Sequence, residues 1–487
     1  MRLRFEQQLK IGQIAISDVK IPFKTRDHLP PLLKALQEIY IDPTLNEKIS
    51  NILYKRISKG KKITGKLGMS LWEIFVLAQV RLCLNCSFDR LHHMTNYDSL
   101  LRSILGVETT DYSMGRQYEY QNIYDNVSLL NIDTLKEINK IIVEFGHKVF
   151  KKKEMEALRI KADTFVFESN VHFPTDINLL WDSGRKCLDV IKCLFEENST
   201  IEGWRKLGNW HLELKKKMRN LSKACSSGGI NKEDRIKRET QAYLKKAKAL
   251  KKKILQFVEF HPVETESVLI KMIGLSYFKD MLDKHIDLVE RRLIKGEKIP
   301  HEEKLFSIFQ TYTEWITKGK LRPNVELGRK VLICTDQYNL IIDWEIIDNQ
   351  ADVDLAIPMV DRLLKKYIIE SLSLDRGFWK KENNELLKLY IPEVVMPKKG
   401  KPNKEERELQ NSSKFKKLRN QHSAIESNIN ELEHRGLDRC PDKSIYAFYR
   451  YVGIGITAYN LQKIGREILK KERNIFEKEQ KKLREAA

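Results

Sequence analysis

The chain has 487 residues, of which 88 are Lys or Arg and 67 are Asp or Glu, so its formal net charge is +21. This length predicts about three domains, and the 41% of hydrophobic residues are enough to build their cores, which excludes a disordered tail. The basic charge favours a polyanionic partner, with nucleic acid the leading candidate. The alternative is that the charge only keeps the protein soluble.

The cysteines and the apolar stretches bear on the cellular compartment. Seven cysteines, scattered over the chain, do not form a disulfide framework and fit a reducing cytoplasm. Cys83 and Cys86 form a CxxC inside a helical pattern without a second ligand pair, so we interpret them as core thiols and not as a zinc site. Every long apolar stretch is interrupted by a charge. The sequence therefore predicts neither a signal peptide nor a membrane span.

Residues 1–150 are predicted to form a helical, DNA-binding N-terminal domain. Apolar residues recur at intervals of three and four in 29–41 and 71–84. Ser70 and Glu73 have the spacing of a capping box at the start of the second helix. The basic segment 55–66 either lies along phosphates or is a solvated loop.

The pattern becomes that of a strand from Ala162, and residues 155–180 are predicted to form the first part of a catalytic core. Asp163 stands directly ahead of the β-prone run TFVFES. An isolated carboxylate in such a basic chain is the first sign of a possible catalytic site.

Residues 181–325 predict a basic helical insertion. Its residues 201–255 contain 17 Lys or Arg against 5 Asp or Glu. An amphipathic helix is predicted from a single apolar stripe made of Ile236, Tyr243, Ala247, Leu250, Ile254 and Val258. Its lysines either contact DNA or are only solvated, and the candidates for DNA contact are Lys245, Lys246, Lys248 and Lys252.

Residues 326–440 predict the second part of the core, and residues 441–487 the C-terminal helices. In the second part, the predicted strands are 330–335, 340–347, 368–375 and 393–397, and the predicted helices are 351–367, 381–390 and 419–434. Together with the strand predicted from Ala162, this order predicts an α/β fold, namely a mixed sheet with ribonuclease H-like connectivity that the insertion interrupts.

Three carboxylates fall where such a sheet would bring them together. Asp163 lies on the first strand, Asp375 at the end of the fourth, and Glu426 on a later helix. Hard oxygen ligands of this kind suit Mg²⁺, for which Mn²⁺ can substitute. Two ions about 3.5–4 Å apart would clamp the attacking and leaving oxygens of a phosphoryl transfer. The ordinary alternatives are an edge charge, a turn residue and a solvated helix residue, respectively.

Polar residues near these acids are candidates for phosphate contacts. Arg419, His422 and Glu426 lie on one stripe of the helix 419–434, beside an apolar stripe. Lys398 and Lys399 lie in a loop that either contacts the DNA backbone or is solvated. We interpret three other acids, Asp336, Asp352 and Asp354, as turn and helix-start residues outside the site.

Several stretches carry a resemblance to a known family. They are LWEIFVLAQVRLCLNCSFDRL, DTFVFESNVHFPTD, EWITKGK with VELG, DRGFWKKEN, PEVVMPKKGK, HSAIESNINELEHRGLDRCPD and YVGIGITAYNL. In this order, from about residue 27 to about residue 465, the chain resembles the DDE transposases of bacterial insertion sequences, in particular the ISNCY type. Related groups often carry Arg four residues before the catalytic Glu, where this sequence has His422.

The resemblance implies a ribonuclease H-like core with Asp163, Asp375 and Glu426 as its metal-binding triad. It also implies a cytoplasmic, nucleoid-associated bacterial enzyme that binds double-stranded DNA, namely element ends and target, and forms a homodimer on paired ends. Such an enzyme hydrolyses a strand at each element end and uses the new 3′-OH to attack target DNA. Two alternatives stay open: a nuclease or resolvase that cuts without joining, and a helical DNA-binding protein without catalysis.

Overall fold

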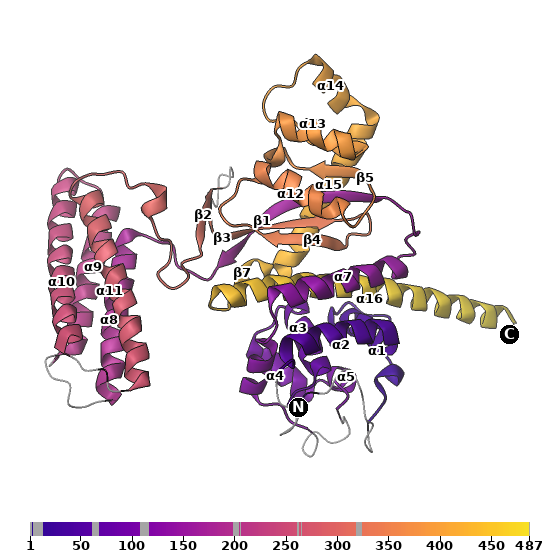
Figure 1. Ribbon diagram of the computed structural model, residues 1–487, viewed down its shortest axis with the longest axis horizontal. Coiled ribbons are helices and arrows are strands. Elements are labelled where there is room, and N and C mark those ends of the chain that lie inside the picture. Colours follow the sequence, from indigo (N-terminus) through magenta and orange to yellow (C-terminus); the bar gives the residue numbers. More distant parts are fainter. Residues whose placement is uncertain are drawn as a thin grey trace. The chain divides into compact units, whose positions relative to one another are not determined.

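The computed structural model describes residues 2, 13–60, 68–107, 116–197, 204, 206–260, 263, 265–317 and 324–486. The chain forms two compact units (Figure 1). The first contains Met1–Asn170 and Gly328–Ala487, and the second contains Val171–Leu327. The second unit is therefore inserted into the first.

A mixed sheet lies at the centre of the first unit. Strand β1 (Leu158–Ser169) has antiparallel β3 (Val325–Thr335) on one side and parallel β5 (Ile369–Leu374) on the other. Antiparallel β4 (Ile341–Ile346) pairs with β3, and parallel β6 (Glu393–Val395) pairs with β5. The short β7 (Arg439–Cys440) pairs with the end of β1. The predicted mixed α/β class is thus confirmed.

The sequence of β1 explains its central place. Phe165, Val166 and Phe167 are all buried, as expected for aromatic and β-branched residues in an inner strand. A Cβ at Gly328 of β3 would lie 2.0 Å from the Phe167 carbonyl oxygen, so this position admits only glycine. The strand begins at Leu158, so Asp163 lies in its middle and not ahead of it.

Helices make up the rest of the first unit. Those before the sheet are α1 (Leu29–Ile41), α2 (Pro43–Ile57), α3 (Leu71–Cys83), α4 (Phe88–Tyr97), α5 (Ser99–Ile104), α6 (Tyr120–Val127) and α7 (Ile132–Val149). Those after β3 are α12 (Asp352–Leu364), α13 (Lys381–Tyr390), α14 (Lys404–Asn411), α15 (Ser413–Leu432) and α16 (Ile445–Ala486). The capping box predicted for Ser70 and Glu73 is present at the start of α3.

The long helix α16 unites the N-terminal helices with the rest of the first unit. It packs against α1, α3 and α7, and both α16 and α7 contact β4 (Figure 1). A Cβ at Gly465 would lie 1.7 Å from the carbonyl oxygen of Pro31, so α1 and α16 approach closely. The division into separate domains at 1–150 and 441–487 is therefore revised, because both segments bury their apolar faces against each other within one unit.

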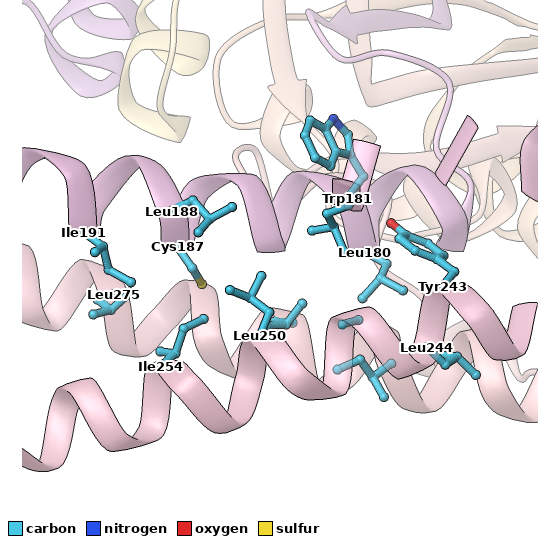
Figure 2. Packing of buried hydrophobic residues seen from close by; sticks show 14 of the residues in the cluster. Leu180, Trp181, Cys187, Leu188, Ile191, Tyr243, Leu244, Leu250, Ile254 and Leu275 are labelled. Carbon is cyan, nitrogen blue, oxygen red and sulfur yellow. The ribbon is translucent and has the colours of Figure 1, made fainter. Parts of the chain in front are cut away.

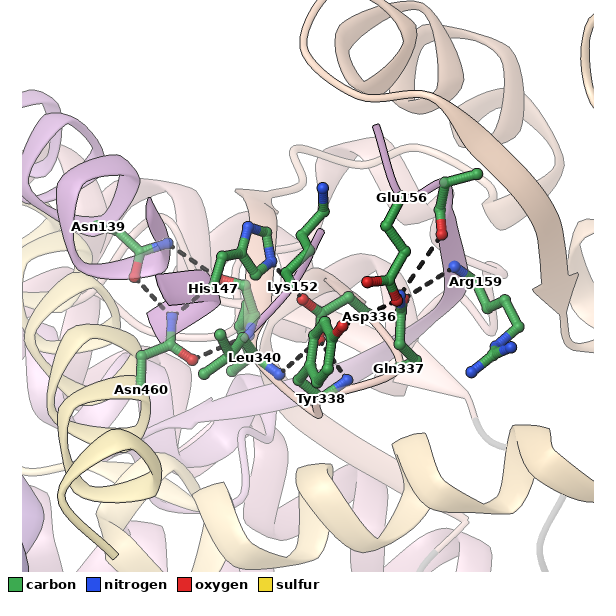
Figure 3. Close-up of polar contacts among 12 residues, drawn as sticks. Asn139, His147, Lys152, Glu156, Arg159, Asp336, Gln337, Tyr338, Leu340 and Asn460 are labelled. Carbon is green, nitrogen blue, oxygen red and sulfur yellow. Dashed lines mark hydrogen bonds and ion pairs between the residues drawn. The ribbon is translucent and has the colours of Figure 1, made fainter. Parts of the chain in front are cut away.

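Figure 3 shows the polar contacts that fix the turn between β3 and β4. Asp336 is buried, accepts hydrogen bonds from the backbone N–H groups of Tyr338 (2.9 Å) and Leu340 (3.0 Å), and lies 2.7 Å from His147 Nε2 of α7. Asn460 of α16 donates to the carbonyl oxygen of Ile341 at 2.9 Å. Asp336 is thus a turn residue, as the sequence indicated.

The second unit is built around a bundle of four helices, α8 (Asp176–Glu197), α9 (Leu207–Ser226), α10 (Lys232–Phe260) and α11 (Glu266–Leu293). It also contains the short strand β2 (Glu314–Thr317). The insertion was predicted as 181–325, and the unit spans 171–327. None of the helices in the described residues is both long and apolar enough to cross a bilayer.

The apolar stripe of α10 is buried inside this bundle (Figure 2). Tyr243, Ala247, Leu250 and Ile254 belong to the core, as predicted. Val258 does not, since it is 36% exposed and the neighbouring Phe257 is buried in its place. The core residues of the stripe are therefore buried within one chain and cannot contact a second copy.

Candidate active site

Asp163 and Asp375 lie next to each other on neighbouring parallel strands. Ala162 of β1 is in register with Leu374 of β5, and each aspartate is the next residue on its strand or just past its end. Residues in register on parallel strands point to the same face of a sheet. The two carboxylates therefore share one face, although the insertion separates them in sequence.

Helix α15 places Glu426 at the same face. Ile425 and Leu432 are buried, and α15 contacts β1, β5 and β6. This buried stripe turns the adjoining polar stripe towards the end of β5. Asp375, Arg419, His422 and Glu426 line one pocket with a volume of about 530 Å³. The helix begins at Ser413, six residues before the predicted start, because Ser412 caps it by accepting from the backbone N–H of Phe415.

The pKa of Asp163 is affected by the other acids of the candidate site. It is raised from 3.8 to about 7, first because burial disfavours the charged form. The negative charges of Asp375, Asp352 and Glu426 raise it further, whereas the backbone N–H of Thr164, which donates to Asp163 Oδ1 at 2.7 Å, partly opposes the shift. Asp163 thus lies within electrostatic reach of both other members of the expected triad.

The donor set is chemically suited to a hard divalent cation. The triad supplies only carboxylate oxygens, and their mutual repulsion would be relieved by positive charge. Among the described residues, however, no three His, Cys, Asp or Glu side chains are already grouped closely enough to hold one metal. Mg²⁺ commonly uses one or two carboxylates and completes its shell with water and substrate phosphates. An open arrangement of this kind fits that behaviour.

Cationic and imidazole groups surround the acids in the pocket. Arg419 and His422 line it, as the helical stripe indicated, and so does Arg376, which the sequence analysis did not single out. The pKa of His422 is lowered, first by burial, while Asp375 and Glu426 act in the opposite direction. The site therefore combines a neutral imidazole with two exposed guanidinium groups that can contact phosphate oxygens.

Asp352 belongs nearer to the site than the sequence indicated. It begins α12, as predicted, but its charge also raises the pKa of Asp163. Lys330 of β3 pairs with it at 2.9 Å. This helix-start residue was missed because its proximity comes from the packing of α12 against the turn Arg376–Phe378 after Asp375, and no local sequence signal marks it.

The candidate lysines of the insertion divide into two kinds. Lys245 and Lys252 are exposed, and no described residue forms an ion pair with either. Lys246 pairs with Glu213 and lies 3.7 Å from the centroid of the Trp210 ring. Lys248 pairs with Glu290 at 2.6 Å. Two of the four predicted DNA contacts thus already have an acidic partner.

The loop after β6 shows the same division. Lys398 pairs with Glu406 at 2.7 Å and lies 5.6 Å from the centroid of the Trp379 ring. Lys399 is exposed. Of these two lysines, Lys399 is the one that keeps the solvent-exposed position expected of a phosphate contact. In the other basic segment, 55–66, residues 61–66 lie outside the described residues.

Comparison with known proteins adds no relative. No family model, curated protein or solved structure matches the chain.

Proposed function

We propose that this chain is a metal-dependent DNA strand-transferring enzyme of the DDE transposase type. The observation that carries the proposal is the convergence of Asp163, Asp375 and Glu426, which come from a strand, the end of a second strand and a helix. The sheet has the order β2-β3-β1-β5-β6, and β4 also pairs with β3. The arrangement of antiparallel β4 and β3 beside parallel β1, β5 and β6 supports a ribonuclease H-like core. The resemblance of the sequence to insertion-sequence transposases points the same way.

In this proposal, Asp163, Asp375 and Glu426 would hold Mg²⁺ or Mn²⁺. The bound metal would activate the attacking oxygen and stabilise the leaving oxygen of a phosphodiester. Arg376 and Arg419 would neutralise phosphate charge beside the reacting group. His422 holds its imidazole between α15 and the end of β5, where it can donate or accept a hydrogen bond with substrate.

Double-stranded DNA is the proposed substrate because the chain has a net charge of +21, and because Lys245 and Lys252 of the insertion are exposed and form no ion pair with a described residue. A homodimer on paired element ends is part of the proposal. The apolar stripe of α10 and the apolar faces of the N-terminal helices are buried within each chain. Contacts between copies would therefore use other surfaces or the DNA.

The experiment is a joining assay. Labelled DNA ends taken from the sequences that border the coding region are incubated with a supercoiled plasmid, the protein and Mg²⁺. Transfer of label to the plasmid supports the proposed function. Cleavage without transfer would support a nuclease or resolvase, and DNA binding without either product would support a non-catalytic DNA-binding protein.

A further inference from the structure

The second unit contains an aromatic pocket that the proposed catalytic site does not use. It has a volume of about 440 Å³ and lies wholly within Val171–Leu327. Its walls come from residues 173–179 around the start of α8, from Arg292 of α11, from residues 301–306 and from β2. Four separate stretches of chain therefore combine to form it.

Four rings line this pocket in a continuous series. The centroid of Phe173 lies 5.4 Å from that of Trp315, Trp315 lies 5.6 Å from Phe306, and Phe306 lies 5.3 Å from His301. Phe173 is 60% exposed, so much of its surface is accessible to a ligand. A series of rings beside an open pocket provides faces on which a flat aromatic ligand can stack.

Two cations lie among these rings. Arg292 lines the pocket and pairs with Asp176 at 2.7 Å through one of its nitrogens, which leaves other guanidinium N–H groups for a ligand. Lys304 also lines the pocket, and no described residue forms an ion pair with it. The ligand that matches both features is flat, aromatic and negatively charged.

We propose that this pocket binds an unpaired nucleobase of single-stranded DNA, with the adjoining phosphates held by Arg292 and Lys304. Stacking on aromatic side chains beside a basic surface is the usual way in which proteins bind single strands without reading their sequence. A base within an intact duplex is covered on both faces by its neighbours, so the pocket selects a strand that is open or frayed. The inference rests on the proposed function only in taking DNA as the polymer.

The test is binding of a short oligothymidylate that carries one 2-aminopurine, measured without metal so that no strand is cut. The wild-type protein should quench the 2-aminopurine fluorescence by stacking. Phe173→Ala should weaken binding of the single strand by about tenfold and remove most of the quenching. Binding of a duplex of the same length should change much less.

Phe260→Ala is the matched control, because Phe260 is 79% exposed in the same unit but does not line the pocket. It should leave binding and quenching unchanged. A Phe173→Tyr variant should keep both, and circular dichroism should show native helix content in all three. Equal losses for Phe173→Ala and Phe260→Ala, or no loss for Phe173→Ala, would overturn the inference.

Catalysis is assessed separately. Asp163→Asn should lose strand cleavage and retain the oligothymidylate binding. If the pocket binds the single strand but no variant cleaves DNA, the proposed catalytic function fails and the pocket stands. If the wild-type protein cleaves DNA but Phe173→Ala binds the oligothymidylate as tightly as the wild type does, the proposed catalytic function stands and the inference about the pocket fails.

Discussion

Asp163 on β1 and Asp375 after β5 occupy adjacent positions on neighbouring parallel strands, one residue beyond the registered pair Ala162 and Leu374. This adjacency, together with Glu426 on α15, is the basis for a metal site. We predict that Asp163→Ala, Asp375→Ala and Glu426→Ala each weaken Mn²⁺ binding by at least about tenfold, or about 1.4 kcal/mol. Isothermal titration calorimetry on the DNA-free protein measures this.

Asp354→Ala serves as the control for these variants. Asp354 is an exposed acid in the first turn of α12 that does not line the pocket. Its replacement should leave Mn²⁺ affinity unchanged. If one of the triad variants behaves like Asp354→Ala, that residue is not a ligand.

The raised pKa of Asp163 predicts how the metal-free protein responds to pH. The folded state keeps a proton on Asp163 up to about pH 7, whereas the unfolded state loses it near the ordinary value of 3.8. The folded state therefore binds more protons in this interval, and the free energy of unfolding falls as pH rises from about 4 to about 7. Above about pH 7 the free energy of unfolding falls no further on account of Asp163.

Asp163→Asn removes this loss of stability, because Asn does not ionise. The variant should be more stable than the wild type at pH 8 by a few kcal/mol, on the order of 1.4 kcal/mol per pKa unit, and the difference should shrink at pH 5. Urea unfolding in EDTA at both pH values provides the measurement. A variant that is less stable than the wild type at pH 8 would contradict a buried, charge-repelled carboxylate.

The lysines of α10 should contribute unequally to DNA binding. Lys245→Gln should lower affinity for any DNA sequence and flatten the plot of log affinity against log salt by about 0.9, because one phosphate contact is lost. Lys246→Gln should change the slope less, since Lys246 is already paired with Glu213. Fluorescence anisotropy at several salt concentrations separates the two. Equal salt slopes for the wild type and Lys245→Gln would show that Lys245 is solvated and does not contact a phosphate.

The contact between α1 and α16 should be essential to the first unit. Gly465→Ala would force a methyl group to within 1.7 Å of the Pro31 carbonyl oxygen, so we expect destabilisation of more than about 2 kcal/mol. Gly274→Ala in α11 meets no atom within 4 Å and should be neutral or stabilising by up to about 1 kcal/mol. Thermal unfolding compares them. A Gly465→Ala variant as stable as Gly274→Ala would show that the helices can separate.

Local sequence patterns predicted β1, β3, β4, β5 and β6 and several of the helices, but not the short strands β2 and β7. Alternation and turn residues identified β3, β4 and β5 within one or two residues at most ends, because these strands are buried runs with clear boundaries. The apolar stripe of α10 was followed correctly to Ile254, but the next core residue is Phe257, since the bundle continues a spacing of four and three. Helix spacing alone allowed either Phe257 or Val258.

Long-range relationships were harder to predict. The approach of Asp352 to Asp163 depends on how α12 packs beside the end of β5, and the packing of α16 against the N-terminal helices joins residues more than 300 positions apart in the sequence. The aromatic pocket around Phe173 and Trp315 combines four segments that share no motif. Such features follow from the tertiary fold and have no local signal in the sequence.

The joining reaction tests the central claim most directly when it is combined with the triad variants. Wild-type protein, Asp163→Ala, Asp375→Ala, Glu426→Ala and the control Asp354→Ala are compared for transfer of a labelled 3′-OH end to a plasmid in Mg²⁺, after each is shown to fold and to bind the end DNA. We expect joined product with the wild type and Asp354→Ala, and none with the three triad variants. Joined product from any triad variant at the wild-type level, or none from the wild type on its own flanking ends, would contradict the account.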